Sequence, residues 1–127
     1  MKTLISIIVN CYNGEKYLKD TIQSVLNQKY QNWEMIFWDN QSNDNNKKII
    51  NKYNDNRIKY FYSNKKLPLY AARNEAIKKS SGELIAFLDT DDWWDEKYLS
   101  SKTEFFDDAN IDYFYNNVFI YYEKNNK

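Results

Sequence analysis

The 127-residue sequence contains no histidine and a single cysteine, Cys11. These absences exclude Ser-His-Asp and Cys-His nucleophilic catalysis, zinc sites built from histidine or several cysteines, and internal disulfides. Any bound metal must therefore have oxygen ligands, which favours magnesium, manganese or calcium. With only two glycines, Gly14 and Gly82, the chain also cannot contain a G-x-G-x-x-G dinucleotide fingerprint or a Walker A loop.

An excess of charge of either sign is also lacking, because 18 Lys and Arg balance 18 Asp and Glu. The overall balance therefore predicts no nucleic acid partner. The charge is unevenly placed, since residues 44–66 hold seven cations and two anions, whereas residues 83–112 hold ten anions and two cations. Such blocks are typical of solvated faces. Because no apolar run approaches the ~20 residues of a membrane span, we expect a soluble, cytoplasmic protein.

Short apolar runs alternate along the chain with segments of helical periodicity. We expect strands at 4–9, 33–38, 57–62, 84–88 and 112–122, and helices at 15–28, 44–53, 69–79 and 95–108. This alternation predicts one α/β domain over residues 1–127, with an open, mostly parallel, Rossmann-like sheet flanked by helices. Ligands of such sheets bind outside the carboxyl ends of the strands, so the residues that follow the strands are candidates for a site.

The strongest chemical signal is the run Asp89-Thr90-Asp91-Asp92, which directly follows the apolar segment 84–88. Three carboxylates within four residues repel one another in a partly dry site, and a divalent cation would relieve that repulsion. Such a cation retains coordination positions for phosphate oxygens, and it neutralises charge on a departing diphosphate. The alternative is a capping cluster, in which Asp92 or Asp95 caps the helix expected at 95–108.

Three weaker signals lie at other strand ends and beside them. Asp39 ends the second expected strand, where its carboxylate can accept a hydrogen bond from a base N–H; the alternative is a turn-forming aspartate. The segment Asn10-Cys11-Tyr12-Asn13 offers backbone groups and one aromatic face to a planar base, or it is only a strand-to-helix turn. Arg73 is one of two arginines among sixteen lysines, and its planar guanidinium suits phosphate or base oxygens or a surface ion pair.

These segments form one ordered pattern: SIIVNCYN at 6–13, YL at 17–18, SVLNQ at 24–28, WE at 33–34, DNQSND at 39–44, ARN at 72–74 and GELIAFLDTDD at 82–92. The pattern resembles glycosyltransferase family 2, whose members have the GT-A fold. It covers almost the whole chain, and the combination is more specific than any one segment. One departure is the run 66–70, which stands where the family usually has glycine or other small residues.

The resemblance implies a nucleotide-sugar-binding half of a glycosyltransferase, and it implies roles for individual residues. The nucleotide and sugar donor, commonly a UDP-sugar, would be held by Cys11, Tyr12, Asn13, Asp39, Arg73, Asp89 and Thr90. Asp89-Thr90-Asp91 matches the DXD motif of the family. Manganese or magnesium would be bound by Asp91 as the most direct contact, together with Asp89 and Asp92.

The implied reaction is inverting transfer of a sugar to a glycan or lipid-linked acceptor in cell-surface polysaccharide synthesis. Catalytic domains of the family are roughly twice as long as this chain, within the upper range for one α/β domain. We therefore expect the acceptor half and the general base to lie beyond Lys127, and no residue here is assigned that role. The chain alone should bind nucleotide and metal but turn over poorly. Peripheral association with the inner face of the membrane and oligomer formation are further expectations.

Two other functions compete with a glycosyltransferase. A non-catalytic nucleotide-binding or assembly module would use sheet edges and helix faces left uncovered by the absent half. A receiver-like, magnesium-dependent phosphotransfer domain also uses aspartates at strand ends. It requires a lone phosphoacceptor aspartate and a lysine at a strand end, and the sequence shows no convincing lysine for that position.

Overall fold

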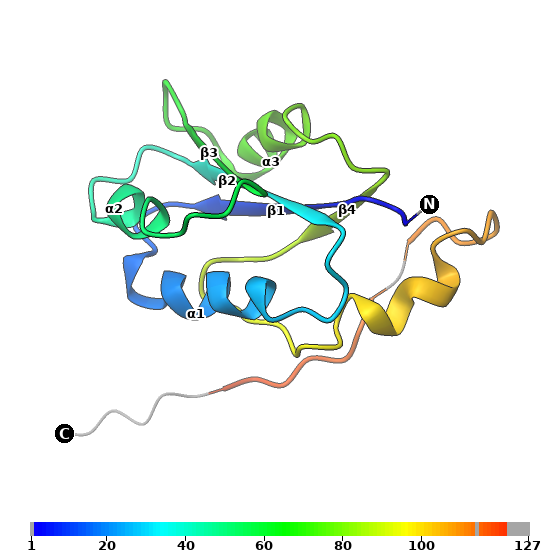
Figure 1. Ribbon diagram of the computed structural model, residues 1–127. Helices are drawn as coiled ribbons and strands as arrows, with labels where there is room; N and C mark the ends of the chain where they lie inside the picture. The colour runs from blue at the N-terminus through cyan, green and yellow to red at the C-terminus, as the bar shows by residue number, and fades with distance from the viewer. Residues whose placement is uncertain (1, 114, 122–127) are drawn as a thin grey trace.

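The computed structural model describes residues 2–113 and 115–121. Its elements are β1 (Ile5–Cys11), α1 (Glu15–Leu26), β2 (Trp33–Asp39), α2 (Asn46–Ile50), β3 (Ile58–Tyr62), α3 (Leu69–Ile77), β4 (Leu84–Phe87) and the 3-10 helix η1 (Ser100–Phe105). The four strands form one parallel sheet in the order β3-β2-β1-β4. Helices α1 and α3 cover its two opposite faces (Figure 1). The expected open parallel sheet flanked by helices is thus confirmed.

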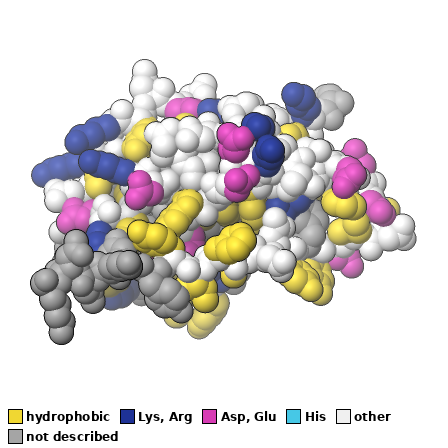
Figure 2. All heavy atoms as spheres, turned by 90° about the horizontal axis from the view of Figure 1, so that it is seen from below, with side chains coloured by type: hydrophobic (Ala, Val, Ile, Leu, Met, Phe, Trp, Pro, Cys, Tyr) yellow, Lys and Arg dark blue, Asp and Glu magenta, His cyan; other side chains and the backbone are white. Residues whose placement is uncertain are grey.

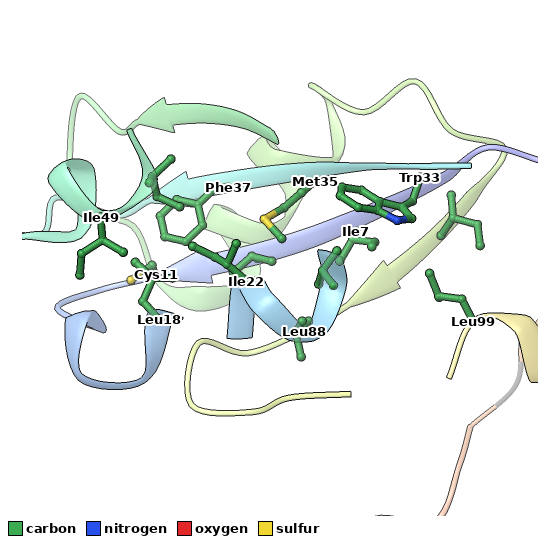
Figure 3. Packing of buried hydrophobic residues seen from close by; sticks show 14 residues of the cluster. Ile7, Cys11, Leu18, Ile22, Trp33, Met35, Phe37, Ile49, Leu88 and Leu99 are labelled. Atoms are coloured by element: carbon green, nitrogen blue, oxygen red, sulfur yellow. The ribbon is translucent and has the colours of Figure 1, made fainter. Parts of the chain in front are cut away.

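The core lies mainly between the sheet and α1. In β1, alternate residues Ile5, Ile7 and Val9 pack toward α1, whereas Ile8 packs toward α3. This alternation follows from the period of two in a strand. Figure 3 shows Leu18 and Ile22 and further apolar side chains of the same cluster, from Ile7, Met35 and Phe37. Each fully buried aliphatic side chain of this kind contributes roughly 1.5–3 kcal/mol, so this packing is a main source of stability for the two central strands.

A buried carboxylate ties the amino ends of the strands together. Glu34 Oε1 accepts hydrogen bonds from Ser6 Oγ (2.6 Å) and from the backbone N–H of Ser81 (2.6 Å). Its Oε2 lies 2.6 Å from Lys59 Nζ. Gly82 completes the arrangement, since its N–H donates to Ser6 Oγ and a Cβ there would lie 2.6 Å from the Ser6 nitrogen. This network fixes the start of β4 against β1.

The helix expected at 95–108 is wrong, because only η1 forms there. The cause is the buried side chain of Gln28. Its Nε2 donates to the Asp95 carbonyl (2.6 Å), and its Oε1 accepts from the Leu99 N–H (3.0 Å). In an α-helix those two backbone groups would bond to each other. Gln28 therefore replaces the first helical hydrogen bond of this segment.

The strand expected at 112–122 is also wrong for the part that the structure describes, residues 112, 113 and 115–121. The aromatic and β-branched composition favours a strand, but strands are stable only when a neighbour pairs with them. Within the described residues the sheet ends at β4. The apolar side chains of the segment are instead exposed: Tyr113, Tyr115, Val118, Phe119, Ile120 and Tyr121.

Replacing Glu34 with glutamine should remove a pH-dependent part of the stability. Burial raises the pKa of Glu34, but the hydrogen bonds from Lys59, Ser6 and Ser81 outweigh this effect and lower the pKa from 4.5 to about 2. The folded protein then binds fewer protons at this site than the unfolded chain. The contribution, on the order of 3 kcal/mol, is therefore complete above pH 4.5 and is lost as the pH falls through about 2.

Urea unfolding of wild type and Glu34→Gln between neutral pH and pH 2 measures this effect. The difference between their free energies of unfolding should shrink as the pH falls. The exposed Glu104→Gln control should differ little from wild type at any pH. A Glu34→Gln difference that is independent of pH would contradict the assignment.

Candidate functional site

The carboxyl ends of all four strands lie at one edge of the sheet, at the left in Figure 1. The segments that leave them are 12–14 after β1, 40–45 after β2, 63–68 after β3 and 88–95 after β4. All the site residues predicted from the sequence lie in these segments, at the strand ends themselves or in α3. The parallel sheet therefore brings the predicted residues to the same side of the molecule.

The segments after β1 and β2 are joined by hydrogen bonds through polar side chains. The Asn13 N–H donates to Ser42 Oγ (2.8 Å), and the Asn43 N–H donates to Asn13 Oδ1 (2.9 Å). Asn46 Nδ2 lies 2.9 Å from the sulfur of Cys11. Burial, as the largest effect, raises the pKa of Cys11 to about 11, so that its thiol stays protonated. Cys11 is thus a core residue whose side chain faces away from solvent.

Tyr12, in the first loop, presents its side chain to solvent, with 48% of its surface exposed. The Nζ of Lys66 lies 3.5 Å from the centroid of the Tyr12 ring, in a cation–π contact. Lys66 comes from the segment after β3, so two strand exits meet at this ring. An exposed tyrosine ring at a strand end is suited to stacking with a planar ligand.

Asp39 is buried, with 2% of its surface exposed. Its Oδ1 accepts the N–H of Ser42 (2.7 Å), and its Oδ2 accepts the hydroxyl of Tyr60 (2.7 Å). Burial and this hydrogen bond raise the pKa of Tyr60. Tyr60 was not predicted as a site residue, although Tyr60 and Asp39 lie on the sheet face that Phe37 also occupies. Strand alternation across the β2–β3 pair is the signal that would have found it.

The acidic turn after β4 is held in place by α1. Thr21 Oγ1 lies 3.0 Å from the Thr90 carbonyl and 2.8 Å from the Asp92 carbonyl. The turn itself closes through the Asp92 N–H, which donates to the Asp89 carbonyl (3.1 Å). Thr21 was also not predicted as a site residue, because its position in the sequence indicates only that it belongs to the helix expected at 15–28. The result is a fixed backbone that presents the carboxyl groups of Asp89, Asp91 and Asp92 outward.

Gly14 allows the first loop and the acidic turn to pack closely. A Cβ at this position would lie 2.8 Å from Cys11 Sγ and 2.8 Å from Thr90 Oγ1. Both distances are shorter than normal contacts. Cys11 and Thr90 are consequently brought together, and with Asn13, which is exposed and bonds to the segment after β2, they form walls of the site.

Arg73 and Asp89 form an ion pair across the site, with Arg73 Nη2 3.3 Å from Asp89 Oδ1. On the same turn, partial burial and then the charges of Asp91 and Asp89 raise the pKa of Asp92. The carboxylates are thus close enough to repel one another. Among residues 2–113 and 115–121, however, no group of three or more His, Cys, Asp or Glu is arranged to hold a metal ion.

The helix-capping alternative for the aspartates receives no support from the local structure, since no α-helix follows them in the described residues. Asp95 Oδ1 accepts the Lys97 N–H (2.8 Å), which closes a local turn. Asp95 therefore has a structural role, whereas Asp89 and Arg73 face each other. The chemistry available at this edge is anion binding by Arg73 and cation binding by the neighbouring carboxylates.

A family model described as "Glycosyl transferase family 2" matches residues 6–127, and the chain belongs to this family. The Escherichia coli UDP-Glc:alpha-D-GlcNAc-diphosphoundecaprenol beta-1,3-glucosyltransferase WfgD is 39% identical over 117 residues, which are 92% of this chain and 46% of WfgD. The chain spans less than half the length of the curated relatives that it matches first. The resemblance drawn from the sequence is therefore confirmed.

Two solved structures place the chain within the GT-A fold. S. aureus TarS 1-349 in complex with UDP-GlcNAc matches with a TM-score of 0.76 and 30% identity, over 84% of this chain and 32% of TarS. The mannosyltransferase PcManGT from Pyrobaculum calidifontis, in complex with GDP-Man and Mn2+, matches with a TM-score of 0.81 over 87% of this chain and 34% of PcManGT. At 18% identity, PcManGT shows the fold alone.

No helix within the described part of the chain has the length and apolar character that a membrane crossing requires.

Replacing Tyr60 with phenylalanine should destabilise the protein by about 1–3 kcal/mol, because one oxygen of the buried Asp39 carboxylate loses its donor. Tyr62 lies on the same strand and is 55% exposed, so Tyr62→Phe is the matched control and should be nearly neutral. Free energies of unfolding from urea titrations decide the comparison. Equal stabilities for the two variants would show that the Tyr60 hydroxyl does not support Asp39.

Proposed function

We propose that this chain is the nucleotide-sugar-binding domain of an inverting, metal-dependent glycosyltransferase. It would bind a UDP-sugar and deliver the sugar to a glycan or lipid-linked acceptor in cell-surface polysaccharide synthesis. The observation that carries the proposal is the pairing of Arg73 with Asp89 on an acidic turn that α1 and the first loop hold at the sheet edge. The UDP-Glc and diphosphoundecaprenol in the name of WfgD, and the UDP-GlcNAc bound to TarS, support the substrate classes.

In this proposal each part of the edge has one task. The exposed ring of Tyr12 stacks on the base, and Arg73 binds phosphate oxygens through its planar guanidinium. Asp39 shapes the base pocket by fixing the 40–45 segment through Ser42, and each of its oxygens keeps a lone pair for a base N–H. Cys11, Asn13 and Thr90 build the walls that set the distance between the base and the diphosphate.

Manganese or magnesium fits the donor set of the acidic turn, which consists only of oxygens, from carboxylates, backbone carbonyls and the Thr90 hydroxyl. Asp91 would be its most direct ligand, with Asp89 and Asp92 beside it. Two protein carboxylates are sufficient when the diphosphate supplies the remaining oxygens, so a preformed cluster of three is not required. The bound cation supplies charge neutralisation for the departing nucleoside diphosphate.

No residue of 1–127 is proposed as the general base or as part of the acceptor surface. Because the chain spans less than half of WfgD, we assign both to a further polypeptide segment. A lipid-linked acceptor would place the complete enzyme at a membrane surface, and the proposal places it at the inner face. The chain alone should therefore bind UDP and metal with little or no turnover.

Calorimetric titration of UDP, with and without manganese, tests the proposal in wild type and in Asp91→Ala. Wild type should bind UDP more tightly with manganese, and Asp91→Ala should lose on the order of tenfold in the manganese-dependent affinity, equivalent to ~1.4 kcal/mol. Asp107→Ala, an exposed aspartate outside the edge, should behave like wild type. Equal, metal-independent heats in wild type and Asp91→Ala would refute the proposal.

A second candidate function, a non-catalytic nucleotide-binding or assembly module, is favoured by exposed apolar side chains near the end of the described chain. Val118, Phe119, Ile120 and Tyr121 are all exposed. Trp93 and Tyr121 line a groove that α1 borders, and hydrophobic side chains gather on this face of the molecule (Figure 2). Light scattering separates the two functions: a tight oligomer without UDP affinity favours assembly, and a monomer that UDP stabilises favours the transferase.

A further inference from the structure

Asn40 joins three strand exits through hydrogen bonds that are shielded from solvent. Its backbone N–H donates to the Cys11 carbonyl at the end of β1 (2.8 Å). Its side chain bonds twice to Leu67 in the segment after β3: Nδ2 donates to the Leu67 carbonyl (2.7 Å), and Oδ1 accepts the Leu67 N–H (2.9 Å). Only 8% of the Asn40 surface is exposed. The amide is needed in full, because one end donates and the other accepts.

This double contact fixes the residue that precedes Leu67, which is Lys66. The other side of the segment is fixed at Ser63, whose N–H donates to the Asp39 carbonyl (2.8 Å) and whose hydroxyl donates to the Lys65 carbonyl (2.5 Å). Lys66 itself is exposed. An exposed lysine on a segment held at both ends has a restricted reach, and its ammonium lies over the Tyr12 ring.

A planar base that stacks on Tyr12 must therefore share the space of the Lys66 ammonium. The cation–π contact is worth about 0.5–1 kcal/mol at an exposed site, so a ligand can displace it. Among residues 2–113 and 115–121, no carboxylate forms an ion pair with Lys66. The contacts of Asn40 and Ser63 do not depend on Tyr12, so the backbone that carries Lys66 stays in place when its ammonium is displaced, and the ammonium is then within reach of the edge of the base.

We propose that Lys66, held in position by Asn40, selects the nucleobase that binds at Tyr12, and that it favours uracil over cytosine. This inference rests on the proposed nucleotide-binding function. An ammonium group has three donors and no acceptor, so it pairs with a carbonyl oxygen and repels an amino group. Uracil presents a carbonyl oxygen at position 4, as thymine does, whereas cytosine presents an amino donor there. Lys66 acts on the base, and Asn40 is a positioning residue.

Dissociation constants for UDP and CDP, measured with manganese present, test the selection. Wild type should bind UDP more tightly than CDP by on the order of tenfold. A factor of this size corresponds to about one hydrogen bond that UDP forms with Lys66 and CDP does not. Lys66→Met retains most of the stem but not the ammonium, so it should weaken UDP binding, leave CDP binding unchanged or slightly tighter, and bring the ratio close to one. Lys65→Met, which changes the neighbouring exposed lysine, should preserve the wild-type ratio.

Asn40→Asp tests the positioning role, because aspartate cannot donate to the Leu67 carbonyl and its charge repels that oxygen. The UDP-to-CDP ratio should fall as in Lys66→Met, whereas a purely structural role would weaken both nucleotides equally. Thermal unfolding shows whether Asn40→Asp is folded. If this variant does not fold, the UDP-to-CDP ratio of Lys66→Met still tests the selection.

Three outcomes would overturn the selection by Lys66. The first is an unchanged UDP-to-CDP ratio in Lys66→Met. The second is an equal loss for UDP and CDP, which would mean that Lys66 binds the phosphates; uridine and cytidine without phosphate would then be unaffected by the substitution. The third is a wild type that binds neither nucleotide, and in that case the proposed function fails as well. Tight UDP binding that depends on Asp91 but not on Lys66 would remove this inference alone.

Discussion

The site depends on one constraint, which is that the segments leaving the parallel strands β2 and β3 carry backbone polar groups that need partners. Asparagine and aspartate side chains supply these partners across neighbouring exits. Asn40 donates to a backbone carbonyl in the segment after β3. Asp39 and Asn13 each accept a backbone N–H of the turn after β2. Because a buried unpaired group costs about 1–3 kcal/mol, these contacts hold the exits in one arrangement. The geometry of the edge is thus a consequence of satisfying the backbone.

The acidic turn follows the same logic with different residues. A threonine on α1 lies within hydrogen-bonding distance of its carbonyls, and a glycine lets the first loop approach the side chain of Thr90. The carboxyl groups of the acidic turn are not needed as hydrogen-bond partners for its backbone, so they remain available at the surface. This division separates residues that hold the edge, such as Thr21, from residues that offer charge, such as Asp91.

The sequence predicted most of this arrangement where the signal was local. The four apolar runs, the polar residues directly after them and the family pattern all predicted side chains at the carboxyl ends of the strands, where the structure brings them to the same side of the molecule. The failures came from contacts between distant residues. Gln28 lies 71 positions from Leu99 and prevents the helix expected there, and Thr21 lies 69 positions from Thr90. Neither contact leaves a periodic trace in the sequence. The expected strand at 112–122 failed because strand propensity does not provide a pairing partner.

The ion pair between Arg73 and Asp89 also bears on the order in which ligands bind under the proposed function. While Arg73 is paired with Asp89, the positive charge of the guanidinium lowers the attraction of the acidic turn for a free cation. A diphosphate offers Arg73 a second anion with a matching planar contact, and it brings oxygens that complete the coordination of the cation. Nucleotide and metal should therefore bind with positive coupling, each raising the affinity of the other by the same factor. A turn with three preformed metal ligands would bind the cation first and would not need this coupling.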